Sequence, residues 1–294
     1  MGQALAVSRG KNQNAHESRS FPNLATLPPE MAQFVLSYLN ATDLCLAACV
    51  WDQLGNDDIL WQGLCKNNWG FTTAYCRRVN NCNFKELYML LDEGRLTFNY
   101  DPEKGISYLM TNGVLEDDPV AIAKFLSGSK INLLRPEKLS EYLKNRRDIL
   151  QEMIYIQNFR MLSLPNALRQ FFKLVSPPTT RGEYLEDILS GFAARYLKCN
   201  PDCGLPQETV YILCYSLILL SVDLYSPQVK RKMSKREFIK NLRGIAVGAC
   251  DDFIGDLYDD IYIQGHIAKP LDKVCIRTPI FPCERPYGNI FAQA

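Results

Sequence analysis

The sequence predicts an all-α fold, and three observations support that prediction. Short segments of helical periodicity follow one another, many begin at a proline or a capping side chain, and none shows strand-like alternation. The strongest segment runs from Thr209 to Val222 and is almost uninterruptedly apolar. A helix that is apolar on every side is buried at the centre of a domain. Because a membrane span needs about 20 apolar residues, we expect a core helix here and no insertion into a membrane.

Composition limits the classes of function. Lys plus Arg number 33 and Asp plus Glu number 32, so no global field attracts nucleic acid, and we expect no nucleic-acid partner. The 11 cysteines lack a regular spacing and indicate reduced intracellular thiols, so we expect a cytoplasmic protein. Cys199 and Cys203 come nearest to a ligand pair, and only His16 and His266 could complete it. We therefore expect no metal and no cofactor.

The two ends of the chain are predicted to be disordered. Residues 1–20 are polar and lack periodicity, and residues 267–294 hold several prolines without periodicity. Gly2 leaves amino-terminal myristoylation open as an alternative, although Ala6 stands where the acylation motif has Ser or Thr.

Residues 21–70 predict three short amphipathic helices. Pro29 suits a helix start, and Thr42 is the expected cap of the next helix. This segment resembles an F-box, with LPPE at its head, LSYLNATDL in the middle and DDILWQGLC before Trp69; one departure is Val50, where the usual pattern has a basic residue.

The F-box resemblance implies docking onto the Skp adaptor and cullin of an SCF-type ubiquitin ligase. A unit of about 50 residues buries little apolar surface alone, so its leucines gain by covering a partner. The expected adaptor contacts are Leu27, Pro28, Leu36, Leu39 and Leu44. The alternative is that these leucines form only the core of a small helical subdomain.

Residues 71–95 predict a connecting helix, with its apolar stripe between Cys76 and Gly94, and residues 96–266 predict a second helical domain. Asp101 and Asp118, each followed by a proline, predict two helix starts. Further helices are expected at 138–143, 149–158 and 165–174. Ser234 and Glu237 form a capping-box pattern that begins a basic helix ending near Gly244.

The segment from Glu208 to Gly244 resembles motif two of the Sec-seven domain. Three patterns of that motif occur in order, namely YxLxYSxIxL, DLxxPxVKxKM and EFIxNxRGI. Earlier segments such as EDDPVAIAKFL and NALRQF also match the family. The resemblance implies an all-helical, superhelical domain that exchanges nucleotide on Arf GTPases. It also implies a GTPase-binding groove at Tyr211, Tyr215, Ile218, Leu219, Asp223, Ser226 and Met233. Ser221, Ser226 and Tyr225 depart from the family's usual asparagines and histidine, and plain helix packing is the alternative role for these positions.

The glutamate that ejects GDP in this family is not matched. Counted from the flanking matches, its position falls on Thr180 or Arg181, and neither is acidic. Glu183 follows a glycine, as the family's glutamate does. Aligning Glu183 with that glutamate would, however, rotate the following helix and bury polar side chains. A cation at this position would attract phosphate, so we expect poor exchange and identify no catalytic residue.

These features predict a substrate-recruiting subunit of an SCF-type ubiquitin ligase whose helical domain binds an Arf GTPase for ubiquitination or regulation. The alternatives are an active Arf exchange factor and a scaffold that binds no GTPase. A basic cluster at Lys230, Arg231, Lys232, Lys235 and Arg236 is usually a solvated helix face, with peripheral membrane contact as the alternative.

Overall fold

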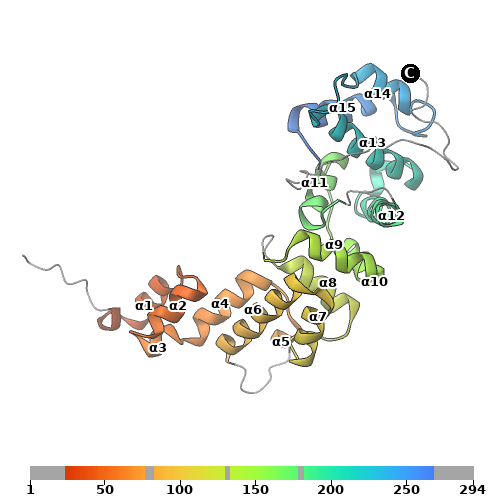
Figure 1. Cartoon of the computed structure of the whole chain (residues 1–294). Helices are drawn as coiled ribbons and strands as arrows, with labels where there is room; N and C mark the ends of the chain where they lie inside the picture. Colours follow the sequence, from red (N-terminus) through yellow and green to blue (C-terminus); the bar gives the residue numbers. More distant parts are fainter. Residues whose placement is uncertain (1–23, 77–82, 130–132, 178–181, 268–294) are drawn as a thin grey trace, which may run out of the picture. The chain divides into compact units, whose positions relative to one another are not determined.

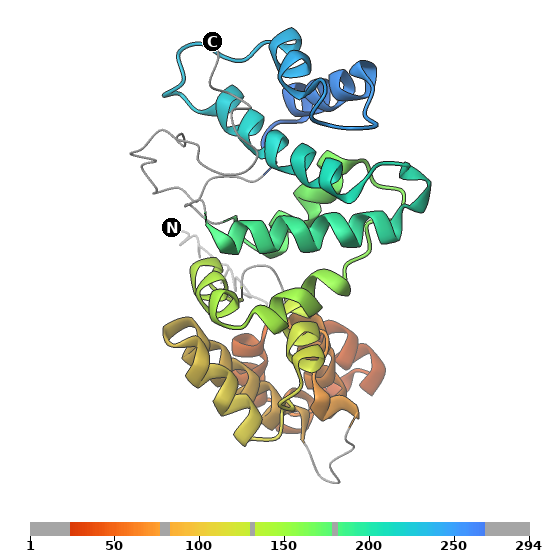
Figure 2. The same cartoon turned by 90° about the vertical axis from the view of Figure 1, so that its right-hand side faces the viewer.

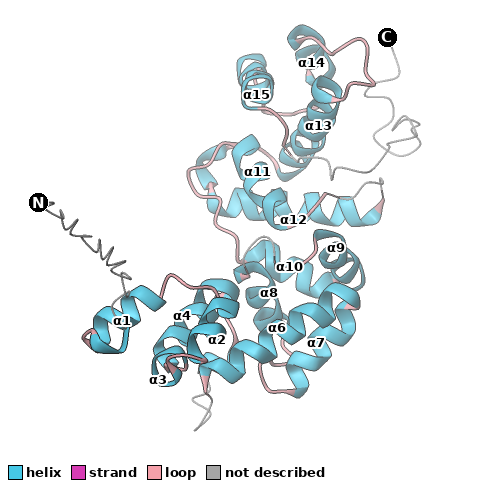
Figure 3. Cartoon of the chain, turned by 60° about the vertical axis from the view of Figure 1, so that its left-hand side comes forward, coloured by secondary structure: helices cyan, strands magenta, loops and turns pink. Residues whose placement is uncertain are grey.

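The computed structural model describes residues 24–76, 83–129, 133–177 and 182–267, and within them every regular element is a helix (Figure 3). The predicted all-α fold is confirmed. Contacts divide the chain into two compact units, residues 1–60 and 61–294, and the division falls within helix α4 (Asp58–Trp69) (Figure 1). The arm predicted for residues 1–20, and the predicted tail beyond Ile267, lie outside the described residues.

The first unit contains η1 (Leu24–Thr26), α1 (Pro29–Leu36), α2 (Ala41–Ala48) and α3 (Asp52–Gly55). Helix α1 begins at Pro29, where a missing N–H costs no hydrogen bond. The cap of α2 is Asn40, whose side chain accepts a bond from the Asp43 N–H at 2.9 Å. The prediction of Thr42 as the cap is wrong, because the helix begins at Ala41, two residues earlier than a Thr42 cap would place it.

The first part of the second unit is built from short helices with local caps. After α4 come α5 (Thr73–Cys76), α6 (Phe84–Tyr100), α7 (Pro102–Thr111), α8 (Pro119–Gly128), α9 (Pro136–Asn145) and α10 (Arg147–Tyr155). Asp101 accepts from the Lys104 N–H and Asp118 from the Ala121 N–H, which confirms both predicted helix starts. The connecting helix predicted from Cys76 begins instead at Phe84, after the cap Asn83.

The remaining helices are α11 (Leu164–Leu174), α12 (Glu183–Cys199), η2 (Pro201–Cys203), α13 (Gln207–Tyr225), α14 (Lys235–Leu242) and α15 (Asp251–Gln264). Helix α13 lies beside α12 (Figure 2) and also packs against α11 and α15. It is 19 residues long and apolar enough to cross a membrane by length and composition. Its contacts with three helices are those of a core helix.

One ion pair ties α11 to α15. Arg169 Nη1 lies 2.6 Å from Asp260 Oδ1, and both side chains are largely buried. Arg169 Nη2 also donates to the carbonyl of Gly265 at 3.1 Å, at the residue that ends α15. Because a largely buried charge is stable only when it is paired, this contact fixes the end of α15 against α11.

Helices α6 and α7 approach each other closely at Gly105. A Cβ placed on this residue would lie 2.4 Å from Phe98 Cα, which is backbone and cannot rotate away. The Gly105→Ala variant should therefore lower the free energy of unfolding by about 2 kcal/mol, because the two helices must separate. Thermal unfolding followed by circular dichroism measures this as a midpoint lower by about 4–8 °C.

The matched control is Gly63→Ala on α4, where a Cβ would meet no atom within 4 Å. This variant should be neutral or slightly stabilising, since alanine is the better helix former by about 1 kcal/mol. Equal midpoints for the two variants would contradict the close packing of α6 and α7.

Candidate functional site

Helix α13 is not buried on every side. Eight of its residues are buried, among them Leu213, Leu217 and Leu220. Tyr211, Tyr215 and Ile218 are half-buried and follow one another at intervals of four and three, so they share one face of the helix. The predicted core helix is confirmed by its packing against α11, α12 and α15. The apolar face at Tyr211, Tyr215 and Ile218 is less deeply buried than the rest of the helix.

The seven residues predicted to line a groove are all half-buried. Five lie on α13, Ser226 is its C-cap, and Met233 precedes α14. From Tyr211 to Asp223 the helix axis spans about 18 Å, at 1.5 Å per residue. The structure brings Met233 to the carboxyl-terminal end of the helix, because the Met233 N–H donates to the Asp223 carboxylate at 2.7 Å. We call these seven residues the α13 face.

The segment after α13 is held by contacts that the sequence did not predict. Lys232 Nζ donates to the carbonyls of Asp223 and Ser226. The Tyr258 hydroxyl on α15 donates to the Met233 carbonyl at 2.8 Å. Met233 is thus fixed through both its N–H and its C=O, by two different helices.

Two of the residues that depart from the Sec-seven pattern have structural roles. Ser221 is 2% exposed, and its hydroxyl accepts from the Ile267 N–H and lies 3.1 Å from His266 Nδ1. Burial lowers the pKa of His266, so its ring is neutral at pH 7 and Nδ1 can accept the serine proton. The Tyr225 hydroxyl lies 2.9 Å from the carbonyls of Ile261 and Tyr262. Both side chains therefore join α13 to the end of α15.

Thr180 and Arg181, the predicted positions of the missing glutamate, lie outside the described residues. Glu183 is exposed and is the first residue of α12. One residue later, Tyr184 is buried under two cations, with Lys144 Nζ 5.7 Å and Arg147 Cζ 5.2 Å from its ring centroid. Arg147 also forms an ion pair with Asp187. The start of α12 is therefore held against α9 and α10.

Much of the basic cluster is engaged within the domain. Arg231 pairs with Glu237 at 3.1 Å, and Lys235 pairs with Asp259 on α15. Lys230 and Arg236 are exposed and form no ion pair with any residue that the structure describes. The Ser234 and Glu237 capping box is present, as predicted.

In the first unit, the predicted adaptor contacts divide between core and surface. Leu36 and Leu44 are buried, Leu27 and Leu39 are half-buried, and Pro28 is exposed. The exposed apolar surface lies on other residues, with Met31 54%, Phe34 58% and Val35 45% exposed on α1 and Tyr38 75% exposed just after it. Their spacing of three, four and seven from Met31 would have predicted this face. We call these four residues the α1 face.

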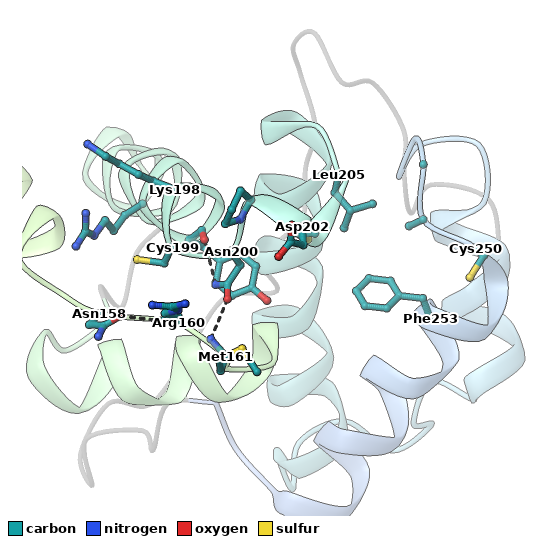
Figure 4. A pocket seen from close by; sticks show the side chains of 16 residues that line it. Asn158, Arg160, Met161, Lys198, Cys199, Asn200, Asp202, Leu205, Cys250 and Phe253 are labelled. Carbon is teal, nitrogen blue, oxygen red and sulfur yellow. Dashed lines mark hydrogen bonds between the residues drawn. The ribbon is translucent and has the colours of Figure 1, made fainter.

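A separate cavity of about 860 Å³ lies where α12 ends and α13 and α15 begin (Figure 4). Leu205 and Phe253 lie on one side of it, and Asn158, Arg160 and Met161 on the other. None of the residues of the α13 face lines it. The cavity is therefore distinct from the predicted groove.

Comparisons with known proteins agree with this two-part organisation. The family model for the Sec7 domain (the Sec-seven domain) matches residues 88–264, and the F-box-like model matches residues 24–67. The chain therefore belongs to the F-box proteins that carry a Sec-seven domain. It is 52% identical over 263 residues to F-box only protein 8 of Mus musculus, a match that covers 88% of this chain and 82% of that relative.

Two further matches concern the second unit. The ADP-ribosylation factor guanine nucleotide-exchange factor sec72 of Schizosaccharomyces pombe is 37% identical over 183 residues, which cover 60% of this chain and 10% of that relative. The crystal structure of the Sec7p catalytic domain superimposes with a TM-score of 0.53 at 33% identity, over 58% of this chain and 95% of that chain.

The Asp223→Ala variant tests the contact that holds Met233. Loss of a hydrogen bond to a charged acceptor should cost about 1–2 kcal/mol locally and release residues 226–234 without unfolding the domain. Limited digestion with trypsin should then cut faster after Lys230, Arg231 and Lys232 than in the wild type. The control is Asp256→Ala, an exposed aspartate on the same domain. Equal rates of cleavage in all three proteins would contradict the role of Asp223.

Proposed function

We propose that the chain recruits an Arf family GTPase to an SCF-type ubiquitin ligase, for ubiquitination or regulation. The Sec-seven domain binds the GTPase through the α13 face, and the F-box binds the Skp adaptor, and through it the cullin, with the α1 face. The proposal rests on one observation above all: α13 is the central apolar helix of its domain, and the family's GTPase-binding positions lie together on its half-buried face. Such a role needs no catalytic residue in this chain.

The exposed α1 face supports a protein that joins partners. An exposed face of several large apolar side chains is a typical protein-binding feature, since it is costly to leave in water. The α1 face consists of three such side chains on a helix of eight residues and of Tyr38 just after it. A helix of this size buries little of its surface within its own unit, so a partner surface gains from covering it.

Exchange of nucleotide is the second candidate function, and the 37% identity to a guanine nucleotide-exchange factor favours it. The charge of the residues between α11 and α12 argues against exchange activity. An exchange factor must bind the nucleotide-free GTPase better than its GDP form, and a carboxylate near the phosphate provides that difference by repulsion. Thr180 provides no charge and Arg181 the opposite one. We therefore propose binding without efficient exchange.

The proposed partners indicate the cell compartment in which the protein acts. A ligase subunit that captures Arf GTPases would act in the cytoplasm, at the surface of the membranes where those GTPases function. Lys230 and Arg236 leave their charges available to anionic lipid, at about 1 kcal/mol for each cation near the surface.

Binding to the Skp adaptor should depend on the α1 face. In the full chain, Phe34→Ser should weaken adaptor binding at least tenfold, because it removes a large anchor from an apolar contact, while the exposed position leaves folding intact. Surface plasmon resonance with immobilised adaptor measures the affinity. The matched control is Tyr100→Ser, an aromatic side chain 81% exposed in the second unit, which should bind as the wild type does. Absence of binding by the wild type would refute the ligase assignment.

Binding to the GTPase should depend on the α13 face and should occur without nucleotide release. An Arf GTPase loaded with fluorescent GDP should bind the full wild-type chain, while the fluorescence decays at its intrinsic rate. Tyr215→Ala should lower the affinity at least tenfold, since a half-buried aromatic is a typical anchor. Tyr155→Ala, an exposed tyrosine on α10, is the control and should bind as the wild type does.

Two outcomes would change this assignment. Accelerated release of GDP by the wild type would make the chain an exchange factor, and Glu183 would then be the next residue to change. Equal binding by a folded Tyr215→Ala variant would refute the α13 face as the GTPase site. Release by an Arg181→Glu variant alone would support a competent groove that lacks its acidic residue.

A further inference from the structure

In the segment between α13 and α14, a serine hydroxyl lies among basic side chains. Residues 226–234 form no helix, and Lys230, Arg231, Lys232 and Ser234 are all exposed. Lys235 and Arg236, also exposed, follow directly. Protein kinases bind substrates as accessible segments and select them by charge pattern, and acidic substrate clefts select serines with basic residues on either side. Ser234 has Arg231 three residues before it and Arg236 two residues after it.

We propose that Ser234 is a phosphorylation site for a basophilic serine/threonine kinase. In this step the Ser234 Oγ attacks the γ-phosphorus of ATP bound to the kinase, and a new O–P bond forms. The bond between the γ-phosphorus and the β,γ-bridging oxygen breaks, and ADP leaves with that electron pair. The hydroxyl proton goes to the catalytic base of the kinase. The product carries a charge of about −2 on Ser234 at pH 7.

Phosphorylation would oppose three sets of contacts that order this segment. The Ser234 hydroxyl donates to Glu237 Oε2 at 2.7 Å, which a phosphate dianion cannot do, and the two anions would repel each other. The phosphate would also attract Arg231, now paired with Glu237, and Lys232, now bound to the carbonyls of Asp223 and Ser226. Release of these contacts would loosen the segment that positions Met233.

Met233 belongs to the α13 face and directly precedes Ser234. The phosphate would therefore lie one residue from the proposed GTPase site and would reduce the local positive charge. We infer that phosphorylation lowers GTPase binding at least tenfold, a consequence that rests on the proposed function. The modification itself does not depend on that function.

A second serine provides an internal control. Ser163 also has an arginine three residues before it, Arg160, and is exposed ahead of α11. Its other neighbours are apolar, and the buried ring of Phe159 holds the preceding turn in the core. A kinase that requires an accessible segment with cations on both sides should modify Ser234 and leave Ser163 unmodified.

The first experiment maps the site. The full chain is incubated with the catalytic domain of protein kinase C and Mg-ATP, and peptides are analysed by mass spectrometry. Phosphate is expected on Ser234 and not on Ser163. Arg231→Ala should slow the modification at least tenfold, whereas Lys240→Ala, an exposed cation further along α14, should not. An unmodified Ser234, or an equal rate in Arg231→Ala, would overturn the proposal.

The second experiment separates the site from its consequence. GTPase binding is measured before phosphorylation, after it, and after removal of the phosphate with a phosphatase. A reversible loss of at least tenfold supports the regulatory role, and equal binding in all three states would overturn it. Absence of binding before phosphorylation would refute the proposed function, while the mapping result would still decide whether Ser234 is a modification site.

Discussion

The packing of α13 against α11, α12 and α15 is the contact on which the Sec-seven domain depends. Burying a leucine or valine side chain contributes about 1.5–3 kcal/mol, and α13 buries several of them at once. Three neighbouring helices cover only part of a helix surface, however. Because α13 is apolar around its whole circumference, the less deeply buried part is also apolar. A single arrangement thus explains both the stability of the domain and the half-buried apolar face at Tyr211, Tyr215 and Ile218.

Polar contacts then determine the shape of the ends of that face. Asp223 and Tyr258 hold Met233 from opposite sides, and Ser221 and Tyr225 join α13 to the end of α15. Arg169 holds the same end of α15 from α11. The aromatic side chains on the face are therefore presented by a framework in which both neighbouring segments are fixed. This rigidity reduces the conformational entropy that the domain loses when a partner binds.

The sequence could predict the structural features that depend on local signals. The caps at Asp101, Asp118 and Ser234 each act within three residues, so a short pattern contains all the information. Which side of a helix faces the core was harder to predict. Helix α1 is apolar on most of its surface, so the spacing that groups Met31 and Phe34 on one face does not say whether that face or the side of Leu36 packs against the core. The contact between Asp223 and Met233 spans ten residues, and the chain leaves the helix after Tyr225, so no periodicity could reveal it. The position of the missing glutamate lies outside the described residues.

The order of the helix contacts has a consequence for how the chain folds. Many of the extensive contacts join helices that follow each other directly, as in α2 with α3, α6 with α7, α12 with α13, and α14 with α15. Contacts between near neighbours in sequence require only short loops to close, and chains rich in them fold quickly. Each hairpin of helices can also form as soon as it leaves the ribosome, before the rest of the domain has been made. The long apolar helix α13 then finds α12, its first partner, already synthesised, so its most aggregation-prone surface is covered early.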